Sequence, residues 1–172
     1  GCKSAILILT YRRTANLQKI INIVNQSNLD SYIFHDRFND EKNKNENLKV
    51  KAFLKNLNNK NLKIYFRNEN YGLKQNYLSA MKYIFDKGYD SIIYLEDDLL
   101  VADNFIKNIL FLIESFKNND RIFSVSCNNF ELDFNNINYD YDIFFTNRPN
   151  SYGFATWKRK WMKFYRDTDF DA

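Results

Sequence analysis

"IIYLEDDLLV", residues 92–101, is an apolar run of strand type that leads directly into three carboxylates, Glu96, Asp97 and Asp98. Adjacent carboxylates repel one another, and aliphatic surroundings raise the free-energy cost of keeping them charged. A divalent cation would cancel this repulsion, because clustered carboxylate oxygens are hard ligands that suit Mg²⁺ or Mn²⁺. The simpler alternatives are a solvated strand end and helix capping, although Asp103 fills the capping role better.

The three acids are not expected to share one role. Side chains alternate along an extended chain, so Glu96 and Asp98 should point to one face and Asp97 to the other. The pattern therefore indicates a divided acidic site at the end of a strand.

Outward from this stretch, strand and helix patterns alternate along the chain. Continuous apolar runs predict strands over 5–9, 31–36, 62–66, 89–95, 121–126 and 141–146. Apolar residues at helical spacing predict a helix capped by Thr14, then helices over 48–57, 72–87 with Gly88 as terminator, 104–117 capped by Asp103, and 155–165. The polar residues 37–47 are expected to form a surface loop.

This alternation predicts an α/β protein built from βαβ units, with a mostly parallel sheet and helices on both faces. In such sheets, ligands bind at the carboxyl ends of the strands. Residues 10–13, 35–36, 67–70 and 96–98 should therefore lie along one edge, and the chemistry is expected there.

Composition narrows the function classes. The chain has 172 residues, which fits one domain or one domain plus part of another. Its formal charge is +4 without a dense Lys/Arg block, so no nucleic-acid partner is expected. The single histidine, His35, excludes a multi-histidine zinc site, and Cys2 and Cys127 lack metal-ligand spacing. No apolar run approaches the ~20 residues of a membrane span. The predicted location is the cytoplasm, with peripheral association at the inner face of the plasma membrane as an alternative.

A second feature indicates an anionic ligand. Lys74 falls in the first turn of the predicted 72–87 helix, where the helix dipole disfavours cations. A phosphate held by the helix N-terminus together with Lys74 would relieve the mismatch, whereas the alternative is a flexible surface lysine. Arg12 and Arg13 follow the first strand and could face the same anion. A metal site and several cations on one edge are suited to a metal-bridged diphosphate.

Five motifs follow one another along nearly the whole chain: "AILILTYRRTANLQKII", "FHD", "NENYGLKQNYLSAMKYIF", "IIYLEDDLLVADNFIKNIL" and "SYGFATWKRKW". In this order they resemble nucleotide-sugar-dependent glycosyltransferases of the GT-A fold, which is Rossmann-like. The sequence is most similar to bacterial polysaccharide glycosyltransferases and to the Golgi N-acetylglucosaminyltransferase that initiates complex N-glycans.

The resemblance implies a role for each matching residue. Asp98 would bind Mn²⁺ or Mg²⁺ directly, while Glu96 and Asp97 would contact the donor sugar and ribose, or the metal through water. The other donor-binding residues would be Thr10, Tyr11, Arg13, Asp36 and Lys74. "SYGFATW", residues 151–157, would form part of the acceptor side, or its aromatic residues simply pack in the core.

The general base has no clear position. By the resemblance, an acidic base lies beyond the "GF" element, just past Ala172. We therefore expect one GT-A-like domain, with a nucleotide-sugar-binding half over 1–101 and a C-terminally truncated acceptor half over 102–172. The catalytic candidates are Asp97, Asp169 and Asp171.

The implied function is metal-dependent transfer of a sugar, with inversion, from a nucleoside-diphosphate sugar to an acceptor hydroxyl. The acceptor would be a saccharide or a lipid-linked saccharide in bacterial surface polysaccharide synthesis. The alternative is a nucleotide-sugar binding module without turnover. A phosphate receiver or phosphohydrolase is disfavoured, because these folds need a nucleophilic aspartate on the first strand and "AILILTYRR" offers none.

Overall fold

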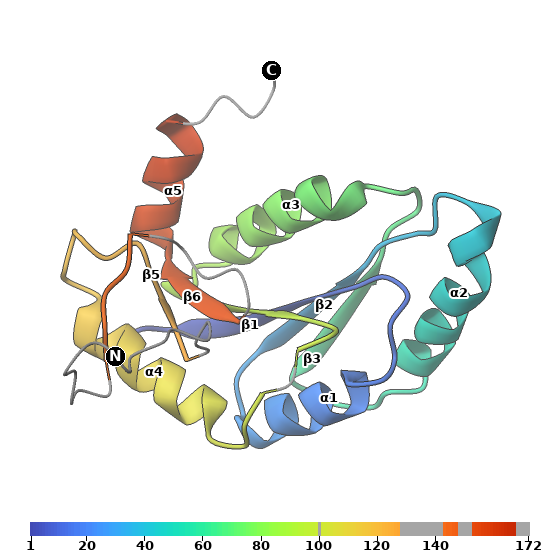
Figure 1. The fold of residues 1–172 in the computed structure, drawn as a ribbon, viewed down its shortest axis with the longest axis horizontal. Helices are drawn as coiled ribbons and strands as arrows, with labels where there is room; N and C mark the ends of the chain where they lie inside the picture. Colours follow the sequence, from blue (N-terminus) through green and yellow to red (C-terminus); the bar gives the residue numbers. More distant parts are fainter. Residues whose placement is uncertain (100, 128–142, 148–152, 168–172) are drawn as a thin grey trace, which may run out of the picture.

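The computed structural model describes residues 1–99, 101–127, 143–147 and 153–167. Within them, one six-stranded sheet has the order β3-β2-β1-β4-β6-β5 (Figure 1). The strands are β1 (Ser4–Thr10), β2 (Ser31–His35), β3 (Leu62–Phe66), β4 (Ser91–Glu96), β5 (Ser124–Ser126) and β6 (Phe154–Trp157). Strands β1 to β4 are parallel, and β6 runs antiparallel to both β4 and β5.

Helices cover both faces of this sheet. They are α1 (Leu17–Gln26), α2 (Glu41–Lys55), α3 (Gly72–Asp86), α4 (Phe105–Phe116) and α5 (Lys158–Asp167). Figure 1 shows α3 on one side of the sheet and α1 and α4 on the other, with α5 pointing away from the body. The predicted α/β class, with a mostly parallel sheet and helices on both faces, is confirmed, and the order β3-β2-β1-β4 is that of a Rossmann-like half.

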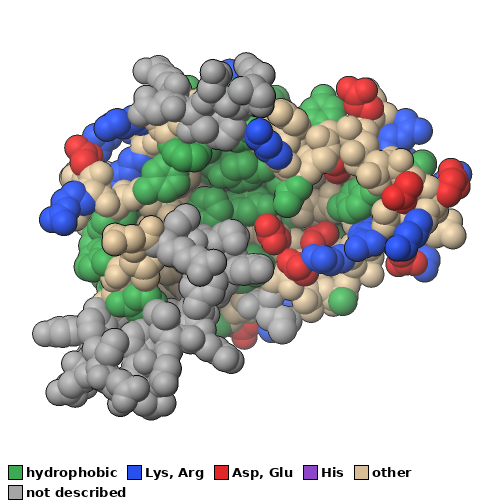
Figure 2. Space-filling view, turned by 45° about the horizontal axis from the view of Figure 1, so that its top comes forward, with side chains coloured by type: hydrophobic (Ala, Val, Ile, Leu, Met, Phe, Trp, Pro, Cys, Tyr) green, Lys and Arg blue, Asp and Glu red, His purple; other side chains and the backbone are tan. Residues whose placement is uncertain are grey.

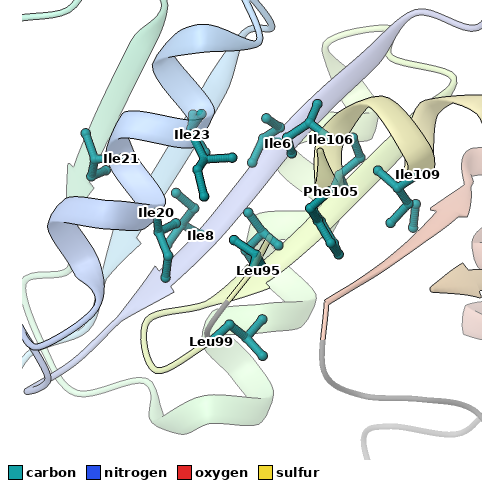
Figure 3. Packing of buried hydrophobic residues seen from close by; sticks show 14 of the residues in the cluster. Ile6, Ile8, Ile20, Ile21, Ile23, Leu95, Leu99, Phe105, Ile106 and Ile109 are labelled. Atoms are coloured by element: carbon teal, nitrogen blue, oxygen red, sulfur yellow. The ribbon is translucent and has the colours of Figure 1, made fainter. Parts of the chain in front are cut away.

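The central strands are buried on both faces, which explains why their sequences are continuously apolar. Ile6 and Ile8 of β1 join the core beneath α1 and α4, as Figure 3 shows, while Leu7 and Leu9 join the core beneath α3. Complete burial of such a side chain contributes roughly 1.5–3 kcal/mol.

The predicted placement of the strand-end segments along one edge of the sheet is confirmed. Thr10 pairs with His35 across the parallel neighbours β1 and β2, and Leu9 pairs with Glu96 across β1 and β4. Parallel strands present their carboxyl ends at the same edge. The segments that follow β1, β2, β3 and β4 therefore meet there.

The prediction of a loop over 37–47 is wrong, because α2 begins at Glu41. Asp40 caps this helix by accepting a hydrogen bond from the Asn43 backbone N–H at 2.8 Å. Pairs of opposite charge three residues apart, such as Lys44 with Glu41, support the first turns. The helix buries few apolar side chains, so hydrophobic periodicity does not reveal its start.

The C-terminal predictions also need correction. A helix was expected over 155–165, but residues 154–157 form β6, which pairs with β4, and α5 begins only at Lys158. The strand expected over 121–126 is shorter, and residues 143–146 are not a strand, while 141–142 lie outside the described residues. The four-residue β6 carries too short a pattern to be separated from the following helix by periodicity.

Two predicted helix caps are wrong, and one terminator is confirmed. Helix α1 begins after Asn16 rather than Thr14, and α4 begins after Asn104 rather than Asp103; neither helix has a side-chain cap hydrogen bond. Gly88 follows α3 with φ +89°, a conformation that favours glycine at a helix end. No helix of the described chain is both long enough and apolar enough to cross a bilayer.

Candidate functional site

The acidic triplet forms a turn at the end of β4. The strand ends at Glu96, and the Leu99 backbone N–H donates to the Glu96 carbonyl oxygen at 3.3 Å. Asp97 and Asp98 occupy the two central positions of this turn. The predicted alternation of side chains therefore does not hold beyond Glu96, because the extended chain has already ended.

Asp98 is joined to two residues of the segment between β1 and α1. The Arg13 guanidinium forms an ion pair with its Oδ2, and the Asn16 side-chain amide donates to its backbone carbonyl oxygen at 3.1 Å. The other carboxylate oxygen, Oδ1, is buried and has no hydrogen-bond partner among the described residues. An unpaired charged oxygen in a buried position costs free energy, so Asp98 is suited to binding a cation.

Asp97 is the more buried acid, at 8% exposure. Its Oδ2 accepts a hydrogen bond from the Tyr11 backbone N–H at 3.3 Å, which ties the turn to the end of β1. Burial raises the pKa of Asp97 to about 6, and the negative charge of Asp98 adds to this effect, while the Tyr11 hydrogen bond and Arg13 oppose it.

Glu96 lies against an aromatic surface. Burial raises its pKa, although the Tyr94 hydroxyl, which donates to Oε1 at 3.2 Å, acts in the opposite direction. The Tyr94 ring lies 5.2 Å from that of Tyr77 and 5.3 Å from that of Phe154, measured between centroids. Figure 2 shows apolar side chains gathered in a hollow next to acidic and basic ones. The turn therefore has charge on one side and aromatic surface on the other.

The ends of β1 and β2 are held together by buried polar contacts. Thr10 Oγ1 lies 2.9 Å from His35 Nδ1, and Thr10 is only 2% exposed. The Asn47 side-chain amide of α2 donates to the carbonyl oxygens of Tyr11 at 2.7 Å and Asp36 at 2.9 Å. Thr10 is therefore buried within this edge of the sheet, whereas Tyr11 and Arg13 reach the protein surface.

Asp36 connects β2 to the start of α3. Its Oδ1 accepts from the backbone N–H groups of Arg37 at 3.0 Å and Tyr71 at 2.8 Å, and its Oδ2 from Gly72 at 2.9 Å. The Asn70 side-chain amide reaches the same Oδ2 at 3.4 Å. Because both oxygens face protein donors, Asp36 orders this part of the edge.

The first turn of α3 carries Lys74, as predicted, on the same edge of the sheet as Asp98. A phosphate beside Lys74 stays a prediction, but the structure offers another explanation for a lysine at this position. The carboxylate of Asp36 already bonds the N–H groups of Tyr71 and Gly72, and supplies negative charge at the helix N-terminus. An external anion is therefore not needed to explain Lys74.

Sequence reasoning missed three residues of this edge: Asn16, Asn47 and Tyr94. Only Tyr94 carried a usable signal, because it lies two positions before Glu96 on a strand and must share its face. The catalytic candidates Asp169 and Asp171 lie outside the described residues, as do 151–152 of the predicted acceptor segment. In the rest of that segment, Trp157 packs in the core.

A metal ion at this site would need coordinating groups from a bound diphosphate as well as from the protein. No group of three or more His, Cys, Asp or Glu side chains is arranged to hold a metal within the described parts of the chain. Asp98, with Oδ1 unpaired, offers one carboxylate. Mg²⁺ and Mn²⁺ are commonly bound through one or two carboxylates plus phosphate oxygens and water. The residues therefore fit a cation that arrives with a diphosphate.

His35 makes the stability of this edge sensitive to acid. Burial lowers its pKa to about 4 from the ordinary value near 6.5, so the folded state binds fewer protons than the unfolded chain between these values. The contribution of His35 to the free energy of unfolding should therefore be fully present above pH 6.5 and be lost as the pH falls. This contribution should be about 2 kcal/mol smaller at pH 5 than at pH 7.

The measurement is urea unfolding of the wild type and of His35→Asn between pH 7 and pH 5. Asparagine keeps a polar group near Nδ1, which lies beside Thr10 Oγ1, but it does not titrate. Asp97 and the other carboxylates are common to both proteins, so their contributions cancel in the difference. Parallel pH profiles in the two proteins would contradict the assignment to His35.

The sequence matches no family model and no curated protein. Among solved structures, S. aureus TarS is similar with 15% identity and a TM-score of 0.46, over 67% of this chain and 20% of TarS. The structure of TarS residues 1–349 gives 14% identity and a TM-score of 0.45, over 67% of this chain and 33% of that one. A protein from Desulfovibrio desulfuricans G20, named as a nucleotide-diphospho-sugar transferase, gives 15% and 0.43, over 66% and 55%. The chain thus spans between 20% and 55% of the length of these three structures, and likenesses this distant assign neither family nor activity.

Proposed function

We propose that the protein is a glycosyltransferase of the GT-A type that uses a nucleoside-diphosphate sugar as donor. The observation that carries the proposal is the acidic turn at the carboxyl edge of four parallel strands, where Asp98 has an unpaired buried oxygen and Arg13 lies beside it. A carboxylate and a guanidinium at one point suit a ligand that combines a cation with phosphate groups.

The donor would be held by residues that follow β1 and β4 and by the first turn of α3. Asp98 would hold Mn²⁺ or Mg²⁺, which when bound stabilises negative charge on the departing diphosphate. Arg13, which is more than half exposed, can pair with phosphate oxygens while it remains near Asp98. Tyr11 and Asp97, joined by the hydrogen bond from the Tyr11 backbone N–H to the Asp97 carboxylate, would line the nucleoside side, and Lys74 would approach from α3.

In the proposed reaction, the bond between the anomeric carbon and the diphosphate oxygen breaks. An acceptor hydroxyl oxygen forms a new bond to that carbon, with inversion, and its proton passes to a carboxylate base. Asp97, Asp169 and Asp171 remain the candidates for this base. The hexosyl type of the donor, a saccharide or lipid-linked acceptor and a role in bacterial surface polysaccharide synthesis belong to the same proposal.

The aromatic surface beside Glu96 supports a sugar ligand at this point. The Tyr94 hydroxyl fixes Glu96, while the neighbouring rings of Tyr77 and Phe154 supply an apolar wall. A sugar ring has apolar C–H faces and a polar rim, so it can contact the rings and the carboxylate together.

The test measures release of nucleoside diphosphate from a panel of nucleotide sugars, with Mn²⁺, with Mg²⁺ and with EDTA. Metal-dependent release that is lost in Asp98→Asn supports the proposal. Donor binding without release, across simple saccharide acceptors, would favour the alternative of a binding module without turnover. Neither binding nor release with any donor would overturn both.

A further inference from the structure

A pocket lies beside the outer strand β3, away from the acidic turn that follows β4. It has a volume of about 480 Å³ and opens at the carboxyl end of β3, which has a strand neighbour on one side only within the described sheet. Strands β1 and β2 stand between β3 and β4. At about 4.8 Å for each of three strand steps, the pocket is roughly 14 Å from the end of β4.

The floor of this β3 pocket is aromatic. The rings of Phe34 and Tyr65 stack with centroids 5.0 Å apart and planes at 17°. Tyr83 of α3 meets both edge-on, at 5.7 Å from Phe34 and 5.3 Å from Tyr65. Tyr65 and Tyr83 are partly exposed, so the floor offers ring surface to a ligand.

Fixed polar groups surround the rings. The hydroxyls of Tyr65 and Tyr83 lie 2.8 Å apart. Arg67 donates to Asn76 Oδ1 at 2.9 Å and to Ser79 Oγ at 2.6 Å. Its guanidinium also lies over the Phe34 ring at 4.6 Å, so its position is set before any ligand arrives.

The charges of the β3 pocket favour an uncharged ligand. Arg67 and Glu69 both line it and carry opposite charges. Arg67 is also committed to α3 and to the rings, unlike the exposed Arg13 beside Asp98. Lys87 lies over the Tyr83 ring, 5.0 Å from its centroid, but Arg67 is held by α3 and the rings, so the acidic turn suits a diphosphate better. The ligand is therefore expected to be neutral, with an apolar face for the rings and hydroxyls for the polar groups.

We propose that the β3 pocket binds a neutral pyranose unit of a saccharide. A pyranose can place its C–H face on Tyr65 and Tyr83 while its hydroxyls reach their phenol oxygens, Arg67 and Glu69. The proposal does not rest on the proposed function, because it concerns binding at another place. In a glycosyltransferase, the pocket would hold a saccharide unit remote from the reacting one.

The test is saturation-transfer-difference NMR with the whole chain and a panel of neutral methyl pyranosides, with uridine as competitor. We expect transfer to the ring C–H protons of at least one pyranoside, unaffected by uridine. Tyr83→Ala should weaken that binding about tenfold, the upper part of the range for an aromatic contact. Phe111→Ala, which removes an aromatic side chain 65% exposed on α4, should leave it unchanged.

Thermal unfolding of each variant separates lost binding from lost folding, and Tyr65→Leu provides a second variant that keeps apolar bulk but removes the ring. Weaker binding in both tyrosine variants, with near-native unfolding temperatures, supports the proposal. Three results would overturn it: no transfer to any pyranoside, equal binding in Tyr83→Ala and the wild type, or displacement by uridine, which would make this a nucleoside site. Loss of turnover in the Asp98→Asn variant has no bearing on these outcomes.

Discussion

The Asp98→Asn variant is expected to lose at least about 100-fold in Mn²⁺-dependent affinity for a nucleoside diphosphate while it keeps its fold. Changes in residues that only support metal ligands typically cost about 10–100-fold, so removal of the direct ligand should reach or exceed that range. Asparagine preserves the size of the side chain but removes the charge. Since Asp98 is only partly buried and is paired with the exposed Arg13, the substitution should change stability little.

The affinity for a nucleoside diphosphate is measured by calorimetric titration, once with Mn²⁺ and once with EDTA. Only the metal-dependent part of the affinity should fall, and the EDTA titrations of variant and wild type should agree. Asp103→Asn is the matched control, because Asp103 is an exposed aspartate close in sequence and its replacement removes the same charge. Equal Mn²⁺-dependent affinities in the wild type and Asp98→Asn would show that Asp98 is not the metal ligand.

The framework of the site could be predicted because its signals are local. The first four strands are apolar runs bounded by polar residues, and three helices with apolar periodicity lie between or after them. Parallel pairing then follows from the βαβ connections, and it brings the ends of β1, β2 and β4 to one edge without knowledge of any contact. Arg13 and Asp98 are 85 residues apart, yet this reasoning placed both on that edge.

The details of the site could not be predicted because they depend on contacts between distant segments. Whether the chain turns at Glu96 or continues extended is decided by packing against Tyr11 and Asn16, which local patterns do not report. The four residues of β6 become a strand because β4 offers a free edge. Helix α2 forms from a polar sequence because Asp40 caps it and its few apolar residues reach the core.

Asp36 shows the same limit most clearly. The resemblance implied that Asp36 contacts the nucleotide, and this stays a prediction. In the structure its carboxylate accepts hydrogen bonds from three backbone N–H groups, two of them those of Tyr71 and Gly72. These two lie 35 and 36 residues further along the chain, at a helix whose start no local pattern connects with Asp36. Both carboxylate oxygens of Asp36 therefore bond to the protein's own backbone, a role in the fold that the sequence did not reveal.

The second large effect is therefore expected on stability: Asp36→Ala should lower the free energy of unfolding by about 3 kcal/mol. Asp36 is 4% exposed, so the substitution leaves its backbone N–H partners without an acceptor in a largely buried place. Each hydrogen bond to a charged group contributes about 1.5–3 kcal/mol, and entry of water should recover part of the sum. The negative charge at the N-terminus of α3 is lost as well.

Asp40→Ala is the matched control, since Asp40 also caps a helix, but it is exposed and accepts from one backbone N–H, that of Asn43. Loss of such a cap costs about 1 kcal/mol. Urea unfolding compares the two variants, and amide hydrogen exchange reports where protection is lost. In Asp36→Ala it should fall at Tyr71, Gly72 and the first turn of α3, including Lys74. If both variants lose the same stability, or if exchange in α3 is unchanged, Asp36 does not hold β2 to α3, and its carboxylate is again a candidate for direct contact with the nucleotide.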